Sequence, residues 1–362
     1  MKKSMKYWIY RVLITLALST TAISGAADYH DLYSNGCCEP ECCDLGCCDE
    51  TESSELECCN SGSSEIDYSD SECYEETATF ELWVDGLIMQ PCQNLRFAQT
   101  AAAPPIMDCS DYLAHWDWDF GYRVGAGIKL PCDSWSVNAE FTCFRPSWAE
   151  ALSVGAGTTI RASISTGAPF GFVPAAGVSS ITTRMDLDYY TCDVVVAYRS
   201  CICDVLELTP YGGFRALWLD QSVAEVRIGG GFGVAPGSKT TLTDEYAGYG
   251  LTSGLRWKFF TCYPFQLLGH VGVSGLMGSH DLNAKAIQMG ITRIWISEGV
   301  WRPNLSAEGS IGALWEYCAW DRLAHLGVRY ENITWSDVFD PFGNGNNTFA
   351  IHGITIRAGL SF

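Results

Sequence analysis

Charged residues are scarce in this chain. They make up 18% of its 362 residues, against about a quarter in ordinary soluble domains. After the amino terminus there is no run of about 18 apolar residues, the length that a transmembrane helix needs. Glycine (36), tryptophan (13), tyrosine (17) and phenylalanine (16) are abundant, which excludes disorder throughout the chain. A large β protein remains.

Basic residues are missing from one long segment. Residues 28–76 contain 16 Asp or Glu and no Lys or Arg. From residue 77 onward, 26 acidic side chains stand against 18 basic ones, so the acidity belongs mainly to a tail. No basic surface is available to neutralise phosphates, which argues against nucleic acid as a partner.

The first 27 residues predict a secretory signal peptide. Lys2, Lys3, Lys6 and Arg11 supply its positive end, residues 12–23 its apolar core and residues 24–27 the small side chains before cleavage. The alternative, a transmembrane anchor, would need a longer apolar core. The mature protein is therefore expected to be exported.

The exported tail is rich in cysteine. Adjacent cysteines rarely bond each other because disulfide geometry requires a wider Cα separation, so each pair suits two different partners and predicts a cross-linking segment. An acidic disordered spacer and a soft-metal cluster are the alternatives. CxxC spacing and histidine are missing from the cysteine cluster, and no metal or other cofactor is predicted. The tail cysteines are Cys37, Cys38, Cys42, Cys43, Cys47, Cys48, Cys58, Cys59 and Cys73.

From residue 79 onward, apolar and polar residues alternate as in β-strands. In the last strand, for example, Ile354, Ile356 and Leu360 oppose Thr355 and Arg357. Ten strands are predicted, at residues 79–89, 119–130, 134–145, 182–199, 207–219, 249–259, 265–277, 304–317, 322–335 and 354–362.

The connections between these strands alternate between long and short. Long gaps span residues 90–116, 147–181, 220–246, 278–303 and 336–349, whereas the gaps between them are tight turns. Long loops at one end and short turns at the other are typical of an outer-membrane β-barrel with periplasmic turns. A soluble β-sandwich is the alternative, but its solvent face should carry charges, and here the polar face is rich in Gly, Ser and Thr. Tryptophans near strand ends predict aromatic girdles; examples are Trp116, Trp118, Trp135, Trp148, Trp218, Trp301, Trp320 and Trp335.

Several stretches resemble a known family. RMDLDYYTCDVVVAYR, LTPYGGFRALWLDQ, YGLTSGLRWKFF, LLGHVGVSGLMG and HLGVRYENITW, in this order, resemble the Legionella-type major outer membrane proteins, a pore-forming family that chlamydia-related bacteria also carry. The resemblance covers roughly residues 79–362. It implies a pore-forming barrel in an envelope held together by disulfides, and no catalytic motif. It does not extend to the tail at residues 37–73.

The domain prediction is a signal peptide at 1–27, an acidic periplasmic tail at 28–77 and an antiparallel transmembrane barrel at 78–362. Ten strands would leave only a narrow passage. Strand-like stretches at 155–165, 221–228 and 285–296 could add hairpins, giving 12 or 14 strands.

The histidines have no recognisable nucleophile signature beside them, so the protein is not expected to be an enzyme.

The polar faces of the strands supply pore-lining candidates if they point into the lumen. Positive and negative groups are nearly balanced, so no ion selectivity follows, and the same charges could instead pair into a ladder across the lumen. The candidates are Arg123, Lys129, Glu140, Glu207, Arg215, Arg256, Lys258, Glu308, Arg329, Glu331 and Arg357, with Glu81, Asp85, Asp119 and Glu316 as further negative positions.

Cysteines also lie at the proposed periplasmic turns, on the face where the tail should emerge. Cys132, Cys201, Cys203, Cys262 and Cys318 are therefore candidates for cross-links to periplasmic or outer-membrane cysteine-rich proteins, or within a homo-oligomer.

Four further cysteines lie elsewhere in the body. Cys92 and Cys109 fall in the first long gap and could bond each other, whereas Cys143 and Cys192 lie within strands, where burial would leave them inert.

The barrel is expected to lie in the outer membrane, surrounded by outer-membrane lipid. Two functions are compatible with the sequence. The first is passive diffusion of small hydrophilic solutes through a pore that is also cross-linked into the envelope. The second is a structural or adhesive barrel with a filled lumen and no transport role.

Overall fold

The part of the chain that the structure describes is almost entirely β-strand. The computed structural model describes residues 78–93, 96–102, 109–113, 116–130, 134–153, 158–162, 179–203, 205–228, 238–262, 265–288, 291–319, 322–336 and 348–362. Within these ranges no helix is long and apolar enough to cross a membrane. The predicted signal peptide and the tail with its nine cysteines lie outside the described residues.

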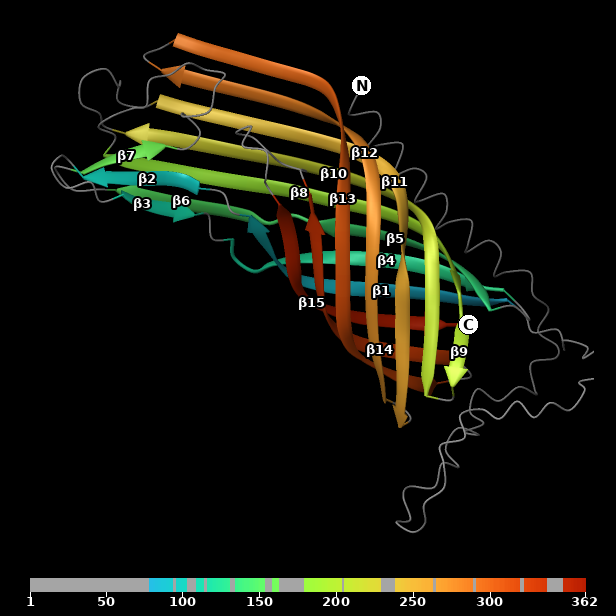
Figure 1. Cartoon of the computed structure of the whole chain (residues 1–362). Helices are drawn as coiled ribbons and strands as arrows, with labels where there is room; N and C mark the ends of the chain where they lie inside the picture. Colours follow the sequence, from blue (N-terminus) through green and yellow to red (C-terminus); the bar gives the residue numbers. More distant parts are fainter. Residues whose placement is uncertain are drawn as a thin grey trace, which may run out of the picture. The chain divides into compact units, whose positions relative to one another are not determined.

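Ten strands close into an antiparallel barrel (Figure 1). Each strand pairs with its neighbours along the chain, β8 pairs with β10, and β15 returns to pair with β1. The barrel strands are β1 (Thr79–Gln93), β4 (Asp119–Lys129), β5 (Trp135–Phe144), β8 (Ser180–Tyr198), β10 (Leu206–Ile228), β11 (Ser238–Cys262), β12 (Phe265–Gln288), β13 (Ile291–Ala319), β14 (Arg322–Trp335) and β15 (Phe349–Ser361).

Five shorter strands accompany the barrel. β6 (Ser147–Ser153) pairs with β8 beyond the end of β5, and β9 (Ser200–Cys203) pairs with the start of β10. β2 (Arg96–Ala102), β3 (Cys109–Leu113) and β7 (Thr158–Ala162) form a separate three-stranded sheet.

The predicted fold class is confirmed, with ten barrel strands at the ten predicted places. The alternatives of 12 or 14 strands are wrong, because residues 221–228 continue β10, residues 285–296 belong largely to the ends of β12 and β13, and β7 joins the small sheet.

The expected long loops at 220–246 and 278–303 are also largely strand. β10 pairs with β11 as far as Arg227 and Ser238, and β12 pairs with β13 as far as Gln288 and Ile291. We call the parts of β10 to β13 that lie in these two regions the β extension. Figure 1 shows β11, β12 and β13 bending sharply as they run into the β extension.

A band of exposed apolar side chains surrounds the barrel near its short-turn end. The barrel strands that carry it have 10 or more residues, enough for a tilted strand to cross the membrane. Large apolar residues on the band include Leu82, Val84, Val124, Val137, Val194, Phe214, Leu251, Val271, Val273, Ile311, Leu326, Val328, Ile354, Ile356 and Leu360.

Aromatic residues mark the edges of this apolar band, as the prediction of girdles required. Trp135 packs on Tyr198 at the short-turn end, with ring centroids 5.0 Å apart, and Tyr249 meets Trp301 at the opposite edge. Three of the tryptophans assigned to girdles are instead buried inside, namely Trp116, Trp148 and Trp335. Strand-end position alone does not tell whether a side chain points inward or outward, and Trp320 lies outside the described residues.

Candidate functional site in the barrel interior

Six charged side chains form a layer across part of the barrel interior, at about the height of Asp85. We call this set the ionic layer. It combines three arginines with three carboxylates, so its formal charges balance, and its members come from five neighbouring strands. They are Asp85 of β1, Arg123 of β4, Glu140 of β5, Arg329 and Glu331 of β14, and Arg357 of β15.

Asp85 is the centre of the ionic layer. Its side chain is 0% exposed, and its carboxylate accepts hydrogen bonds from Arg357 Nε at 2.8 Å and from Arg329 Nη2 at 2.9 Å. Arg123 approaches the same carboxylate at 3.3 Å. Buried charges persist in proteins when they are paired and hydrogen-bonded, and here one carboxylate serves three guanidinium groups.

The remaining contacts close this network. Arg123 forms a forked pair with Glu331, with both N···O distances 3.0 Å, and its Nε lies 3.1 Å from Glu140. Arg357 also reaches Glu140 at 3.4 Å, and Arg329 contacts Glu331. Each guanidinium therefore has at least two carboxylate partners.

A second charged cluster lies on β8, β10, β12 and β13. Arg215 forms a forked pair with Asp193 at 2.7 and 2.8 Å and contacts Glu308 at 2.8 Å. Glu308 also accepts a hydrogen bond from Tyr211, whose hydroxyl lies 2.6 Å from His270 Nε2. Asp193 is the register partner of Glu140, so the two clusters adjoin through β5 and β8.

Apolar side chains fill the interior beyond the ionic layer, on the side away from the short turns. We call this set the apolar plug. Its inward residues on the barrel strands are almost completely buried; for example, Leu217, Trp335 and Phe349 are each 0% exposed. The plug comprises Leu87, Met89, Phe144, Leu187, Tyr189, Leu217, Leu219, Tyr246, Leu276, Trp335, Phe349 and Ile351, together with Trp116 and Trp148.

The interior is hollow on the short-turn side of the ionic layer. A vestibule of about 290 Å³ is lined there by residues of both charged clusters and by further charged side chains. Lys129 pairs with Glu81 at 2.5 Å, and Lys258 lies 3.8 Å from Glu316. Arg256 stacks over the ring of Tyr211, with no ion-pair partner among the described carboxylates.

The structure places all eleven predicted pore-lining candidates on the inner face. Ten of them line the vestibule, and Glu207 is buried near the short-turn end, where it accepts a hydrogen bond from Thr209. Seven of them belong to the two charged clusters and form ion pairs there. The sequence analysis did not find Asp193 and Tyr211. The apolar run Val194-Val195-Val196 interrupts the alternation, so the face on which Asp193 lies cannot be read from it, and Tyr211 follows a proline.

Four of the predicted cross-linking cysteines can be placed on the backbone, one of them with its side chain. Cys201 is exposed and its thiol is free, at the short-turn end of the barrel. Cys203, Cys262 and Cys318 lie in the strands at that end, but their side chains are outside the described part, as is Cys132 entirely. Cys143 is buried and Cys192 is partly buried. Cys92 is the last residue but one of β1 and does not lie in a loop.

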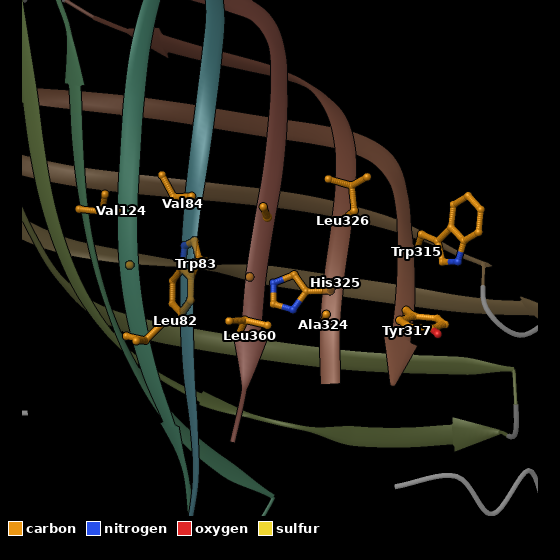
Figure 2. Close-up of a pocket in the computed structure, with 13 residues that line it drawn as sticks. Leu82, Trp83, Val84, Val124, Trp315, Tyr317, Ala324, His325, Leu326 and Leu360 are labelled. Atoms are coloured by element: carbon orange, nitrogen blue, oxygen red, sulfur yellow. The ribbon is translucent and has the colours of Figure 1, made fainter. Parts of the chain in front are cut away.

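The outer face carries a shallow apolar groove across β13, β14, β15, β1 and β4. Figure 2 shows Leu82, Val84, Leu326 and Leu360 around it, with Trp315 and Tyr317 at its far side. The small residues Ala324 and Ala358 form its floor. This groove lies within the apolar band, where lipid chains are the expected surrounding.

The family model described as Legionella pneumophila major outer membrane protein precursor matches residues 73–360. The chain belongs to this family. As a member of it, with a barrel ringed by an apolar band, the protein resides in the outer membrane. No curated protein sequence matches the chain significantly.

Three solved structures that match the chain do so with low sequence identity and low TM-scores. The outer membrane protease OmpT from Escherichia coli has 10% identity and a TM-score of 0.42, covering 78% of this chain and 96% of its own. A major outer membrane protein from Thermus thermophilus has 10% identity and a TM-score of 0.34, covering 79% and 100%. The toluene transporter TodX of P. putida has 11% identity and a TM-score of 0.23, covering 79% and 90%.

Proposed function

We propose that this protein is a structural barrel of the outer membrane, with a lumen closed at rest, and that it carries a β extension outside the membrane. The observation that carries this proposal is the stacking of the apolar plug on the ionic layer. A diffusion pore needs a continuous water-filled path, whereas the interior here is occupied by buried side chains, as in small filled barrels.

The extension supports the structural role. β10 to β13 continue well beyond the apolar band, and polar residues such as Thr243, Glu245 and Lys285 lie on their outer face there. Barrels of this class place short turns in the periplasm, so the extension projects from the cell surface. An adhesive or envelope-coating role needs such a surface and needs no open lumen.

Conductance tests the closed lumen directly. We expect the full mature chain, from residue 28 onward, to give no stepwise openings in a planar bilayer, because ions cannot cross the ionic layer and the apolar plug. Heat-modifiable migration on gels verifies folding, and protease protection in vesicles verifies insertion. Stepwise openings that scale with salt concentration from protein passing both checks would contradict the proposal.

A diffusion pore is the second candidate, favoured by one observation. The vestibule already hollows the lumen on its short-turn side, so displacing the ionic layer and the apolar plug would complete a path. Liposome swelling with small sugars distinguishes the two candidates, since a pore admits them and a closed barrel does not.

We further propose that the barrel is cross-linked into the envelope through cysteines at its short-turn end. Support comes from the exposed, free thiol of Cys201 at that end and from the strand-end positions of Cys203, Cys262 and Cys318. We expect non-reducing gels of intact envelopes to show disulfide-linked multimers of this protein. They should diminish when Cys132, Cys201, Cys203, Cys262 and Cys318 are replaced by Ser.

A matched control for the cross-linking is the variant with Cys143→Ser and Cys192→Ser. These two cysteines lie within the barrel strands, so their loss should leave the multimers unchanged. Monomer alone in wild-type envelopes, without reductant, would contradict cross-linking.

A further inference from the structure

A thiol, an imidazole and a phenol meet on the outer face of the barrel at the end of β1. Cys92 Sγ lies 3.1 Å from Nε2 of His352 on β15. Nδ1 of the same imidazole lies 2.9 Å from the hydroxyl of Tyr330 on β14. Trp118 contacts the imidazole edge-on, with ring centroids 5.7 Å apart. Three neighbouring strands thus hold the cluster together.

The cluster lies at the membrane edge on the extension side of the barrel. On β1 the outward residues run from Leu82 and Val84 through Ile88 to Cys92, so the thiol is past the end of the apolar band. Exposed Trp118, just before β4, occupies the level of an aromatic girdle. Cys92 is exposed, so a solute can reach it from outside.

The two contacts fit one proton arrangement that base catalysis needs. With the proton on Nδ1 of His352, Nδ1–H donates to the Tyr330 hydroxyl oxygen and Nε2 accepts from the Cys92 thiol. A free thiol is mostly protonated at neutral pH, and the adjacent imidazole supplies the acceptor that nucleophilic attack requires.

We propose that Cys92 and His352 form a thiol–disulfide exchange site on the cell-surface side of the outer membrane, and that it takes small soluble disulfides. His352 accepts the thiol proton as Cys92 Sγ attacks one sulfur of the disulfide. The new Cys92–sulfur bond forms while the original S–S bond breaks, and the released thiolate takes the proton from His352. A thiol and a disulfide enter, and a thiol and a mixed disulfide leave, so electrons balance.

The surroundings favour an uncharged or weakly charged disulfide. Among the described residues, the side chains that contact His352 or lie beside it in register are Gln90, Trp118 and Tyr330, and these carry no charge at neutral pH. Tyr330 acts as a positioning residue, because it contacts the imidazole and not the reacting sulfur. This activity does not depend on whether the lumen conducts.

The test measures the modification rate of each cysteine separately. Full mature protein is reduced, desalted and treated at pH 7 with the neutral probe 4,4′-dithiodipyridine, and the modified peptides are quantified by mass spectrometry over time. Cys201 is an internal reference, since it is exposed and free but has no base bonded to it among the described residues. We expect Cys92 to react about tenfold faster than Cys201.

Variants separate base catalysis from a structural effect. His352→Gln should slow Cys92 about tenfold while the rate of Cys201 stays constant. His352→Ala should behave alike and recover part of its rate when imidazole is added to the buffer. Tyr330→Phe should slow Cys92 by a smaller factor, since the imidazole remains.

Three outcomes would overturn the proposal. One is a Cys92 rate equal to that of Cys201 in the wild type. Another is an unchanged Cys92 rate in His352→Gln with the barrel still heat-modifiable. The third is a loss in His352→Ala that imidazole does not restore, because a purely structural role predicts that result.

Discussion

Replacing Asp85 with Asn will lower the free energy of unfolding of the barrel by about 3–5 kcal/mol. The carboxylate is completely buried and contacts Arg123, Arg329 and Arg357. Asn keeps nearly the same shape, so the cost comes from leaving positive charge uncompensated in the interior rather than from a cavity. Unfolding in urea after reconstitution in lipid vesicles, followed by tryptophan fluorescence, measures the change.

Glu81→Gln is the matched control for this variant. Glu81 lies on the inner side of β1, two residues before Trp83 and four before Asp85. It pairs with Lys129 at 2.5 Å. The Lys129 side chain is 40% exposed, so water replaces the lost partner, and the expected cost is below about 1 kcal/mol. Equal losses in the two variants would show that the ionic layer is not buried as described.

Much of this fold could be predicted from alternation alone. The last strand was predicted because Ile354, Ile356 and Leu360 form an apolar face, whereas the opposite face carries Thr355 and Arg357. Such a contrast exists only within the apolar band. Beyond it, β10 sets Val223 and Glu225 inside against Ser222 and Ala224 outside, so neither face is uniformly apolar. The sequence pattern there resembles a loop, and strand pairing reveals it as strand.

The candidate site could be predicted as a set of inward charges but not as a network. Alternation places Arg123, Glu331 and Arg357 on inner faces. Which of them meet depends on the register between β4, β14 and β15. Arg123 and Glu331, for example, are more than 200 positions apart in the sequence. The apolar plug was hidden for a related reason: inward Leu87 and Trp335 look like lipid-facing or girdle residues until the strands close around them.

The pair Cys92 and His352 shows the same dependence on register. The two residues are 260 positions apart, and Cys92 was expected in a loop. They become neighbours because β15 returns to β1 and pairs Gln90 with His352. Barrel closure thus creates both the ionic layer inside and the thiol cluster outside.

The placement of the membrane predicts a contrast between two isoleucines of β13. Ile311→Arg will destabilise the folded barrel by about 2–4 kcal/mol in lipid vesicles, because it puts a charge in the middle of the lipid-facing band. Ile311 is 61% exposed on the outer face, between Gly269 of β12 and Tyr330 of β14. Unfolding free energy in vesicles is the measurement.

Ile296→Arg is the control on the same strand and face. Ile296 is 54% exposed, and its partner across to β12 is Asn283, with Lys285 close by on the outer face. That surface belongs to the extension, so an arginine there stays in water and should cost no more than about 1 kcal/mol. If the two variants were equally destabilised, the extension would lie in the membrane, and the surface-exposed β extension required by a structural or adhesive role would not exist.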